Sequence, residues 1–292
     1  MPDAGIDKLI TDQFGSLSPQ LRLAARFAID NPDEIAVNSM RNVAAKAGVR
    51  PSTMLRLARQ LGFEGYDQLR DLFRERLKAG ASASWSGRAR DLRKSGASPS
   101  KNSLIDRLLA AEHDNLQMTF DAETAKSLRQ ACQIIGSSRL VYVLGLRSLF
   151  PVAFYFHYVC RMFMGKTVLL TGTGGTFADD LRRVEKGDTV VAFSYHPYAR
   201  DSVKAVNFAS KKGARIIAVT DSRVSPIMVP AKVGIVVSNT TPSLFPTILP
   251  AFAVAQALAA LLVQESGDET MANLARTESQ LEAFGVYFDS DK

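Results

Sequence analysis

The chain has 292 residues, of which 46% are hydrophobic and 22% charged, and it carries 36 basic against 29 acidic side chains for a net charge of +7. This is the composition of a globular protein with about two domains, and it excludes a collagen-like or wholly disordered chain. The two cysteines, Cys132 and Cys160, form no CxxC pair. A disulfide framework and a cysteine zinc site are therefore excluded, we expect no metal or cofactor, and a reducing cytoplasm is the predicted location.

Neither the N-terminus nor the longest charge-free stretch has the pattern of a membrane segment. The first residues include acids and lack an apolar run, unlike a signal peptide. The longest charge-free stretch, residues 233–264, is interrupted by polar residues and prolines. We expect it to form a strand, a loop and a buried helix rather than a membrane span.

Helical signals dominate residues 1–80. Ser18 and Pro19 have the chemistry of a helix start, and a short element is expected around residues 35–37. Ser39 is predicted to cap a helix that ends at Gly48. Further helices are predicted from Pro51 to the glycine at position 62, and over residues 66–77.

The segment from Ser39 to Gly62 has the mechanics of a helix-turn-helix motif. Gly48 supplies the left-handed turn residue, and the second helix begins at Pro51 with an apolar stripe on one face. The segment contains five basic residues and no acid, which is typical of phosphate-backbone binding. A packing hairpin with a solvated basic face is the alternative. The predicted DNA-binding residues are Arg41, Lys46, Arg50, Ser52, Thr53, Arg56 and Arg59.

Residues 81–104 are predicted to be a flexible linker, because they are rich in Ser, Ala and Gly, carry a net positive charge and lack apolar periodicity. Beyond them, residues 105–290 are predicted to form an α/β domain. One or two helices come first, and then short apolar runs alternate with helical segments. This alternation predicts a five-stranded parallel sheet covered on both faces, in the order 2-1-3-4-5. The predicted strands are 140–144, 167–170, 189–194, 215–220 and 233–238.

The helix-turn-helix segment resembles a known family. The stretch SMRNVAAKAGVRPSTMLRLARQLGFEGYDQLRDLF is similar to the N-terminal domain of RpiR/MurR-type bacterial transcriptional regulators. Arg50 stands where the family usually has Ser, at the cap of the recognition helix. Arg is a poor N-cap, so either Ser52 caps the helix or Arg50 is kept for a phosphate contact. The resemblance implies that the partner is double-stranded operator DNA.

Two predicted strands end in loops suited to anion binding. The first loop contains Gly145, Arg147 and Ser148, and the second runs from Ser194 through residues 195–201. In an open parallel sheet, ligands bind at the carboxyl ends of the strands, beside the point where the strand order reverses. Ordinary strand-to-helix turns are the alternative. The candidate ligand-binding residues are Gly145, Arg147, Ser148, Ser194, His196, Tyr198 and Arg200.

From about residue 105 to 265 the chain resembles a SIS (sugar isomerase) domain, in the runs YVLGLRS, GDTVVAFSYHPYARDSV and AFAVAQALAALL. The resemblance implies a flavodoxin-like sheet, a homodimer or homotetramer, and a phosphosugar effector bound by hydroxyls of the two loops. Ser148 and Ser194 match the family's phosphate-binding positions. The rest of the second loop departs from the family's Ser-x-Ser-Gly-x-Thr, so a sugar phosphate, a sugar acid and a polyol derivative all remain open as effectors.

The predicted function is that of a two-domain, ligand-responsive transcription factor and not an enzyme, with no catalytic residues. The main alternative is a sugar-phosphate isomerase with an accessory helical domain, for which His196, Glu185 and His157 are the candidate bases. An interaction module without a small ligand is the other alternative. The basic helix pair discriminates against an isomerase, which has no need of it.

Overall fold

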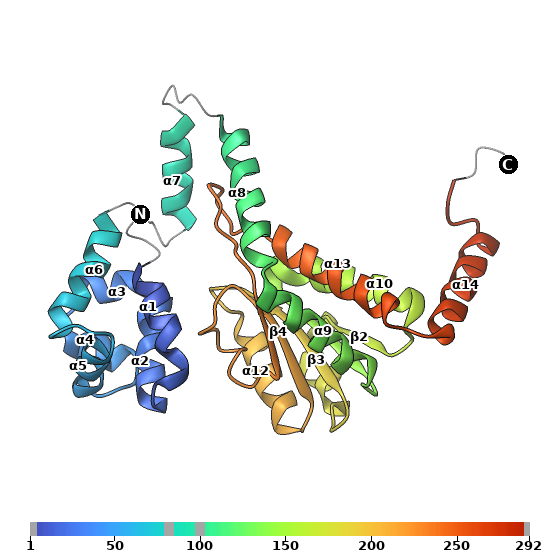
Figure 1. The fold of residues 1–292 in the computed structure, drawn as a ribbon, viewed down its shortest axis with the longest axis horizontal. Helices are drawn as coiled ribbons and strands as arrows, with labels where there is room; N and C mark the ends of the chain where they lie inside the picture. Colours follow the sequence, from blue (N-terminus) through green and yellow to red (C-terminus); the bar gives the residue numbers. More distant parts are fainter. Residues whose placement is uncertain (1–4, 79–84, 97–102, 289–292) are drawn as a thin grey trace. The chain divides into compact units, whose positions relative to one another are not determined.

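The computed structural model describes residues 5–78, 85–96 and 103–288. The chain divides into two compact units, with the main-chain boundary after Leu104. The first unit is helical and the second contains the sheet (Figure 1).

The helices of the N-terminal unit begin where the sequence places their start signals. Figure 1 shows them in blue and cyan. They are α1 (Gly5–Gln13), α2 (Pro19–Asp30), α3 (Pro32–Val37), α4 (Met40–Lys46), α5 (Pro51–Gln60) and α6 (Tyr66–Lys78). Ser39 caps α4 by accepting a hydrogen bond from the Asn42 amide at 3.4 Å, as predicted. Arg50 is the N-cap residue of α5, and no side chain caps this helix.

The core of this unit contains the apolar stripes of all six helices. Ile10, Leu21, Val43, Leu57 and Phe73 are among its fully or almost fully buried members. Residues from α4 and α5 alternate between this core and the surface with helical spacing, so the polar face of α5 is turned outward.

The segment predicted to be a linker contains a helix that the sequence analysis did not predict. Residues Trp85–Gly96 form α7, although they lack an apolar stripe. Arg, Ala, Leu and Lys supply half of its 12 residues, and their intrinsic helix propensity is high. The predicted linker residues 81–84 and 97–102 lie outside the described part of the chain.

The second unit has the predicted parallel sheet. Its strands are β1 (Val141–Gly145), β2 (Thr167–Leu170), β3 (Thr189–Ser194), β4 (Arg215–Thr220) and β5 (Val233–Val236), in the order β2-β1-β3-β4-β5. All four strand pairs are parallel. The boundaries differ from the prediction only for β1, which is shifted by one residue, and for β5, which ends two residues earlier.

Helices cover both faces of this sheet. The helices of this unit are α8 (Leu104–Thr119), α9 (Ala122–Gly136), α10 (Phe150–Phe163), α12 (Arg200–Lys211), α13 (Leu249–Gln264) and α14 (Asp268–Ala283), with the short α11 (Phe177–Asp180) after β2. Helices α9, α10 and α13 pack on one face of the sheet, and α12 packs on the other. Figure 1 shows these helices around the strands.

The two apolar helices differ in how well they are covered. Helix α13 buries seven residues against the sheet and its neighbouring helices, and Leu249 at its start is its one large apolar residue that is exposed. Helix α10 instead leaves Phe150, Phe154 and Tyr158 exposed in a row, with ring centroids 6.2 and 6.3 Å apart. We call these three side chains the α10 aromatic row.

No single helix in the described ranges is long and apolar enough to cross a membrane. Taken together, α13 and α14 meet the length and composition requirement, but the pair is bent by 114° at its junction.

Candidate DNA-binding helix and effector site

The α4–α5 pair forms the predicted helix-turn-helix. Gly48 lies at φ +67°, a backbone conformation that glycine adopts without strain, and the Val49 amide bonds back to the Ala44 carbonyl at 2.9 Å. This turn sets α5 against α4, with Met54, Leu57 and Ala58 buried between the helices of the unit. Because these residues point inward, the opposite side of α5 faces solvent.

Three side chains of α5 lie on that exposed side with helical spacing. Ser52, Arg56 and Arg59 are exposed at positions i, i+4 and i+7. Arg50 and Arg41 are exposed as well. The four exposed arginines form no ion pair with any residue in the described ranges. They are Arg41, Arg50, Arg56 and Arg59.

The other two predicted DNA-binding residues are placed differently. Thr53 is buried, with 9% of its surface exposed, because it lies on the inner side of the first turn of α5. Lys46 forms an ion pair with Glu34 of α3 at 2.5 Å. Glu34, which lies outside the acid-free segment, therefore neutralises the Lys46 charge at one end of the predicted basic surface. The sequence pattern did not reveal this ion pair.

The two predicted effector loops leave neighbouring strands at the same edge of the sheet. Strands β1 and β3 pair directly, with Gly145 opposite Phe193. Ser148 lies in a short 3-10 turn, Arg147–Leu149, immediately before α10, and it is exposed. Ser194 is the last residue of β3 and is 5% exposed. Neither hydroxyl forms a hydrogen bond with another described residue.

The backbone of the first loop is tightly constrained. A Cβ at Gly145 would lie 2.5 Å from the Leu149 carbonyl oxygen and 2.7 Å from the Ala153 Cβ, so only glycine fits there. Arg147 adopts φ +57°, which is rare for a residue with a side chain. Its side chain is exposed and has no acidic partner among the described residues.

The second loop folds onto Asp221, which directly follows β4. The Asp221 carboxylate accepts hydrogen bonds from the His196 amide at 3.0 Å and from the Tyr198 hydroxyl at 3.1 Å. Burial raises the pKa of Asp221, and these hydrogen bonds act in the opposite direction. The Tyr198 hydroxyl proton is thus used within the protein, while the side chains of His196 and Arg200 are exposed.

Asp221 was missed by the sequence analysis, although a signal for it was present. It follows a buried strand at the edge where the two predicted loops lie. A polar residue in that position is a candidate site residue by the same reasoning that selected Ser148 and Ser194.

The candidate bases for an isomerase are not assembled at this edge. Glu185 precedes β3 and forms an ion pair with Arg139, which precedes β1, at 3.0 Å, so both lie at the amino edge of the sheet. His157 lies within α10, and burial together with Arg161 lowers its pKa. Of the three candidates, only His196 lies at the carboxyl edge.

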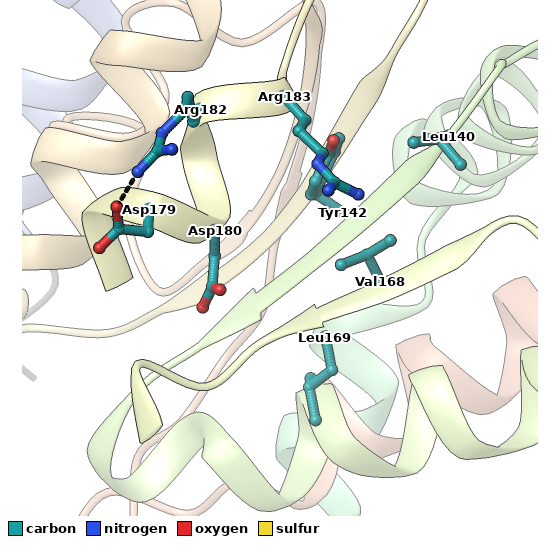
Figure 2. Close-up of a pocket in the computed structure, with 8 residues that line it drawn as sticks. All are labelled: Leu140, Tyr142, Val168, Leu169, Asp179, Asp180, Arg182 and Arg183. Atoms are coloured by element: carbon teal, nitrogen blue, oxygen red, sulfur yellow. Dashed lines mark hydrogen bonds and ion pairs between the residues drawn. The ribbon is translucent and has the colours of Figure 1, made fainter. Parts of the chain in front are cut away.

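The structure also contains a hollow of about 410 Å³ beside β1 and β2, and none of the predicted effector-binding residues lines it (Figure 2). Tyr142, Val168 and Leu169 are among its lining residues, and an ion pair between Asp179 and Arg182 lies on one side. The hollow exists because α11 is only four residues long, too short to cover the edge of the sheet.

Family models match both units. A model described as a helix-turn-helix domain of the rpiR family matches residues 5–79, and one described as a SIS domain matches residues 134–261. The bifunctional protein glk of Burkholderia mallei is 27% identical over 216 residues, which cover 71% of this chain and 31% of that relative. The chain therefore spans about a third of the length of the curated relatives it matches.

Two solved structures share the fold. The sugar isomerase domain of an RpiR transcription factor from Sphaerobacter thermophilus has a TM-score of 0.58 at 23% identity and covers 61% of this chain and 99% of its own. The Vibrio vulnificus NanR protein, solved in complex with ManNAc-6P, has a TM-score of 0.58 at 17% identity and covers 96% of this chain and 98% of its own. With an rpiR-family helix-turn-helix domain and a SIS domain in one polypeptide, the chain belongs to the RpiR-type transcriptional regulators.

Proposed function

We propose that this protein binds operator DNA through α5, that its SIS domain binds an anionic sugar derivative, and that the bound ligand changes the affinity for the operator. The observation that carries the proposal is the presence of two complementary surfaces in one chain. One is an exposed helix face with unpaired arginines, and the other is a pair of free hydroxyls at the carboxyl ends of adjacent strands.

The DNA-binding part of the proposal rests on the outer side of α5. In a helix-turn-helix protein the second helix enters the major groove, and its first residues contact base edges. Ser52 and Arg56 lie on the exposed side of the first turns, and Arg59 lies one turn further on. Arg41, Arg50 and Lys46 flank this helix and are suited to phosphate contacts, although Lys46 must first leave Glu34.

The effector part of the proposal rests on the hydroxyls of Ser148 and Ser194 and on the backbone at Arg147 and Ser148. Left-handed Arg147 is followed by the right-handed turn at Ser148, and residues of alternating hand form a concave arrangement of N–H groups that favours an anion. Arg147, His196 and Arg200 are exposed and supply further positive charge or donors around the same edge. The NanR complex with ManNAc-6P makes a sugar phosphate the first class of effector to examine.

The assembly is a homodimer or homotetramer in this proposal, and the protein works in the cytoplasm, where the DNA is. The α10 aromatic row is the proposed contact, because three exposed aromatic side chains in line form a surface that a second copy would cover. A symmetric dimer would present two recognition helices to half-sites about 34 Å apart.

The proposal is tested by selecting a binding sequence from a random duplex library and titrating it with the protein. The titration is repeated with sugar phosphates, sugar acids and polyol phosphates, and operator affinity is measured by fluorescence anisotropy. We expect at least one anionic sugar derivative to change operator affinity, and we expect Ser148→Ala and Ser194→Ala each to shift the effective concentration about tenfold or more upward. A chain that selects no DNA sequence, or serine variants that respond like the parent, would contradict the proposal.

A further inference from the structure

A short apolar segment at the end of α14 is left without cover. Gly285, at φ +60°, ends the helix, and the amides of Gly285 and Val286 donate to the Glu282 and Leu281 carbonyls at 2.9 and 3.1 Å. These bonds fix the direction in which the chain leaves the helix. The large apolar side chains of the segment are 55–96% exposed, and they are Phe284, Val286, Tyr287 and Phe288. We call residues 284–288 the α14 arm.

The α14 arm leads away from the aromatic row of its own chain. Helix α14 is held at the end of α10, where the Asn273 side-chain amide donates to the Phe163 carbonyl at 3.2 Å and the Thr277 hydroxyl donates to the Met162 carbonyl at 2.8 Å. From there, α14 and the arm extend away from the sheet (Figure 1). One copy of the chain therefore exposes two apolar surfaces, and exposed apolar patches of this kind mark interaction sites.

The areas of these surfaces indicate how they are covered. The three side chains of the α10 aromatic row are 36–51% exposed. At about 200 Å² for a fully exposed aromatic side chain, one row presents roughly 300 Å² and one arm roughly 500 Å². Two rows packed on each other would bury roughly 600 Å², which is well below the 1,200–2,000 Å² or so of a stable interface. Two arms packed on two rows would bury roughly 1,600 Å², which falls within that range.

The charges beside the two surfaces are opposite in sign. Helix α10 contains no acidic residue, and Arg161 is exposed three positions beyond Tyr158, on the same side of the helix. Arg161 forms no ion pair within the described part of the chain. Glu278 and Glu282 are exposed on the last turns of α14, just before the arm. These charges favour the pairing of an arm with a row over the pairing of one arm with another.

We infer that the α14 arm of one copy packs on the α10 aromatic row of a second copy, and that two copies exchange their arms in this way. In such a symmetric dimer each copy supplies one arm and one row, so both contacts form together. This inference rests on the proposed function, because it names what covers the α10 aromatic row in the proposed assembly.

The experiment uses three variants of the full-length chain. The arm variant combines Tyr287→Ser with Phe288→Ser, which leaves Gly285 and the end of α14 intact. The row variant is Phe154→Glu. The matched control is Val229→Ser, which changes an equally exposed apolar residue between β4 and β5, at the opposite edge of the sheet from β2. Self-association is measured by sedimentation equilibrium for each variant alone. An equimolar mixture of the arm and row variants is then measured with one of them fluorescently labelled. Because all these side chains are exposed, the far-UV circular dichroism of each variant should match that of the parent.

We expect the parent and the control to associate alike, and the arm and row variants each to associate at least a hundredfold more weakly, since each loses buried aromatic surface at both contacts. The mixture is the decisive measurement. The row variant still has an intact arm and the arm variant an intact row, so one arm–row contact can form between them. We expect the mixed dimer to form at least tenfold more tightly than either variant associates alone.

Other outcomes overturn the inference. If the arm variant associates like the parent and the row variant does not, the rows contact each other, and the proposed assembly stands without the exchange. If both variants are monomeric and their mixture forms no mixed dimer, the arm does not pack on the row of a second copy. If neither variant differs from the parent, or the parent itself is monomeric, the assembly proposed at α10 fails together with the exchange.

Discussion

The Asn115 side chain on α8 forms hydrogen bonds with the loop that follows β5, and we expect its truncation to destabilise the SIS domain. The side chain is 2% exposed. Its amide nitrogen donates to the Thr240 carbonyl at 2.7 Å, and its oxygen accepts from the Ser238 hydroxyl at 2.7 Å and from the Thr240 amide at 3.2 Å. Asn115→Ala therefore removes three hydrogen bonds and leaves three groups of the loop without this partner.

The size of the effect follows from those three bonds. At about 0.5–1.5 kcal/mol for each net hydrogen bond, we expect a loss of roughly 2–4 kcal/mol in the free energy of unfolding. Water entering the space vacated by the side chain would place the loss at the lower end. Asn115→Asp should cost a similar amount, because it places a carboxylate oxygen against the Thr240 carbonyl.

The assay is urea denaturation of the full-length chain, followed by pulse-labelled hydrogen exchange in peptides from β3 and β5. These peptides report the transition of the SIS domain separately from that of the helical domain. The Thr240 amide should also exchange faster under native conditions, since its acceptor is gone. Gln117→Ala, on the exposed side of α8, is the control. A loss below about 0.5 kcal/mol for Asn115→Ala would show that the loop holds its place without this side chain.

Three further predictions concern the two surfaces and the first loop. Arg56→Ala and Arg59→Ala should each weaken operator binding by about 1–3 kcal/mol if they reach base edges, and the reasoning fails if anisotropy titrations give parental affinity for both. Gly145→Ala should destabilise the SIS domain by about 1–3 kcal/mol and weaken effector binding, because its Cβ would strike the Leu149 carbonyl; an unchanged urea midpoint and affinity would contradict the close approach. A fragment from about residue 100 onward should self-associate in sedimentation, and Phe154→Glu should dissociate it; a parental fragment that is already monomeric would place the assembly elsewhere.

The sequence was sufficient for most of the helices and for the strands and their order. Pro19, Ser39, Gly48 and Pro51 act through local backbone and capping chemistry, so the helices of the N-terminal unit begin and end near the predicted residues. The alternation of strands and helices predicted the parallel sheet and its order, because parallel strands require crossovers that cover both faces. The positions of Ser148 and Ser194 at one edge follow from the same rule.

Helix α7 is an element that the local patterns failed to predict. Half of its residues have high helix propensity, but the linker was predicted from the lack of apolar periodicity. The difference in exposure between α10 and α13 also depends on packing rather than on local pattern. Apolar composition shows that a helix needs cover, but only the packing shows that α13 has it and the α10 aromatic row does not.

The remaining features of the site depend on residues far apart in the chain. Lys46 meets Glu34, and Tyr198 meets Asp221. The sequence determined which residues end strands and which cap helices, because those properties depend on neighbours along the backbone. Only the tertiary structure decided which charges are paired and which buried polar groups are left without partners, because such contacts form between elements whose separation along the chain bears no relation to their distance in space.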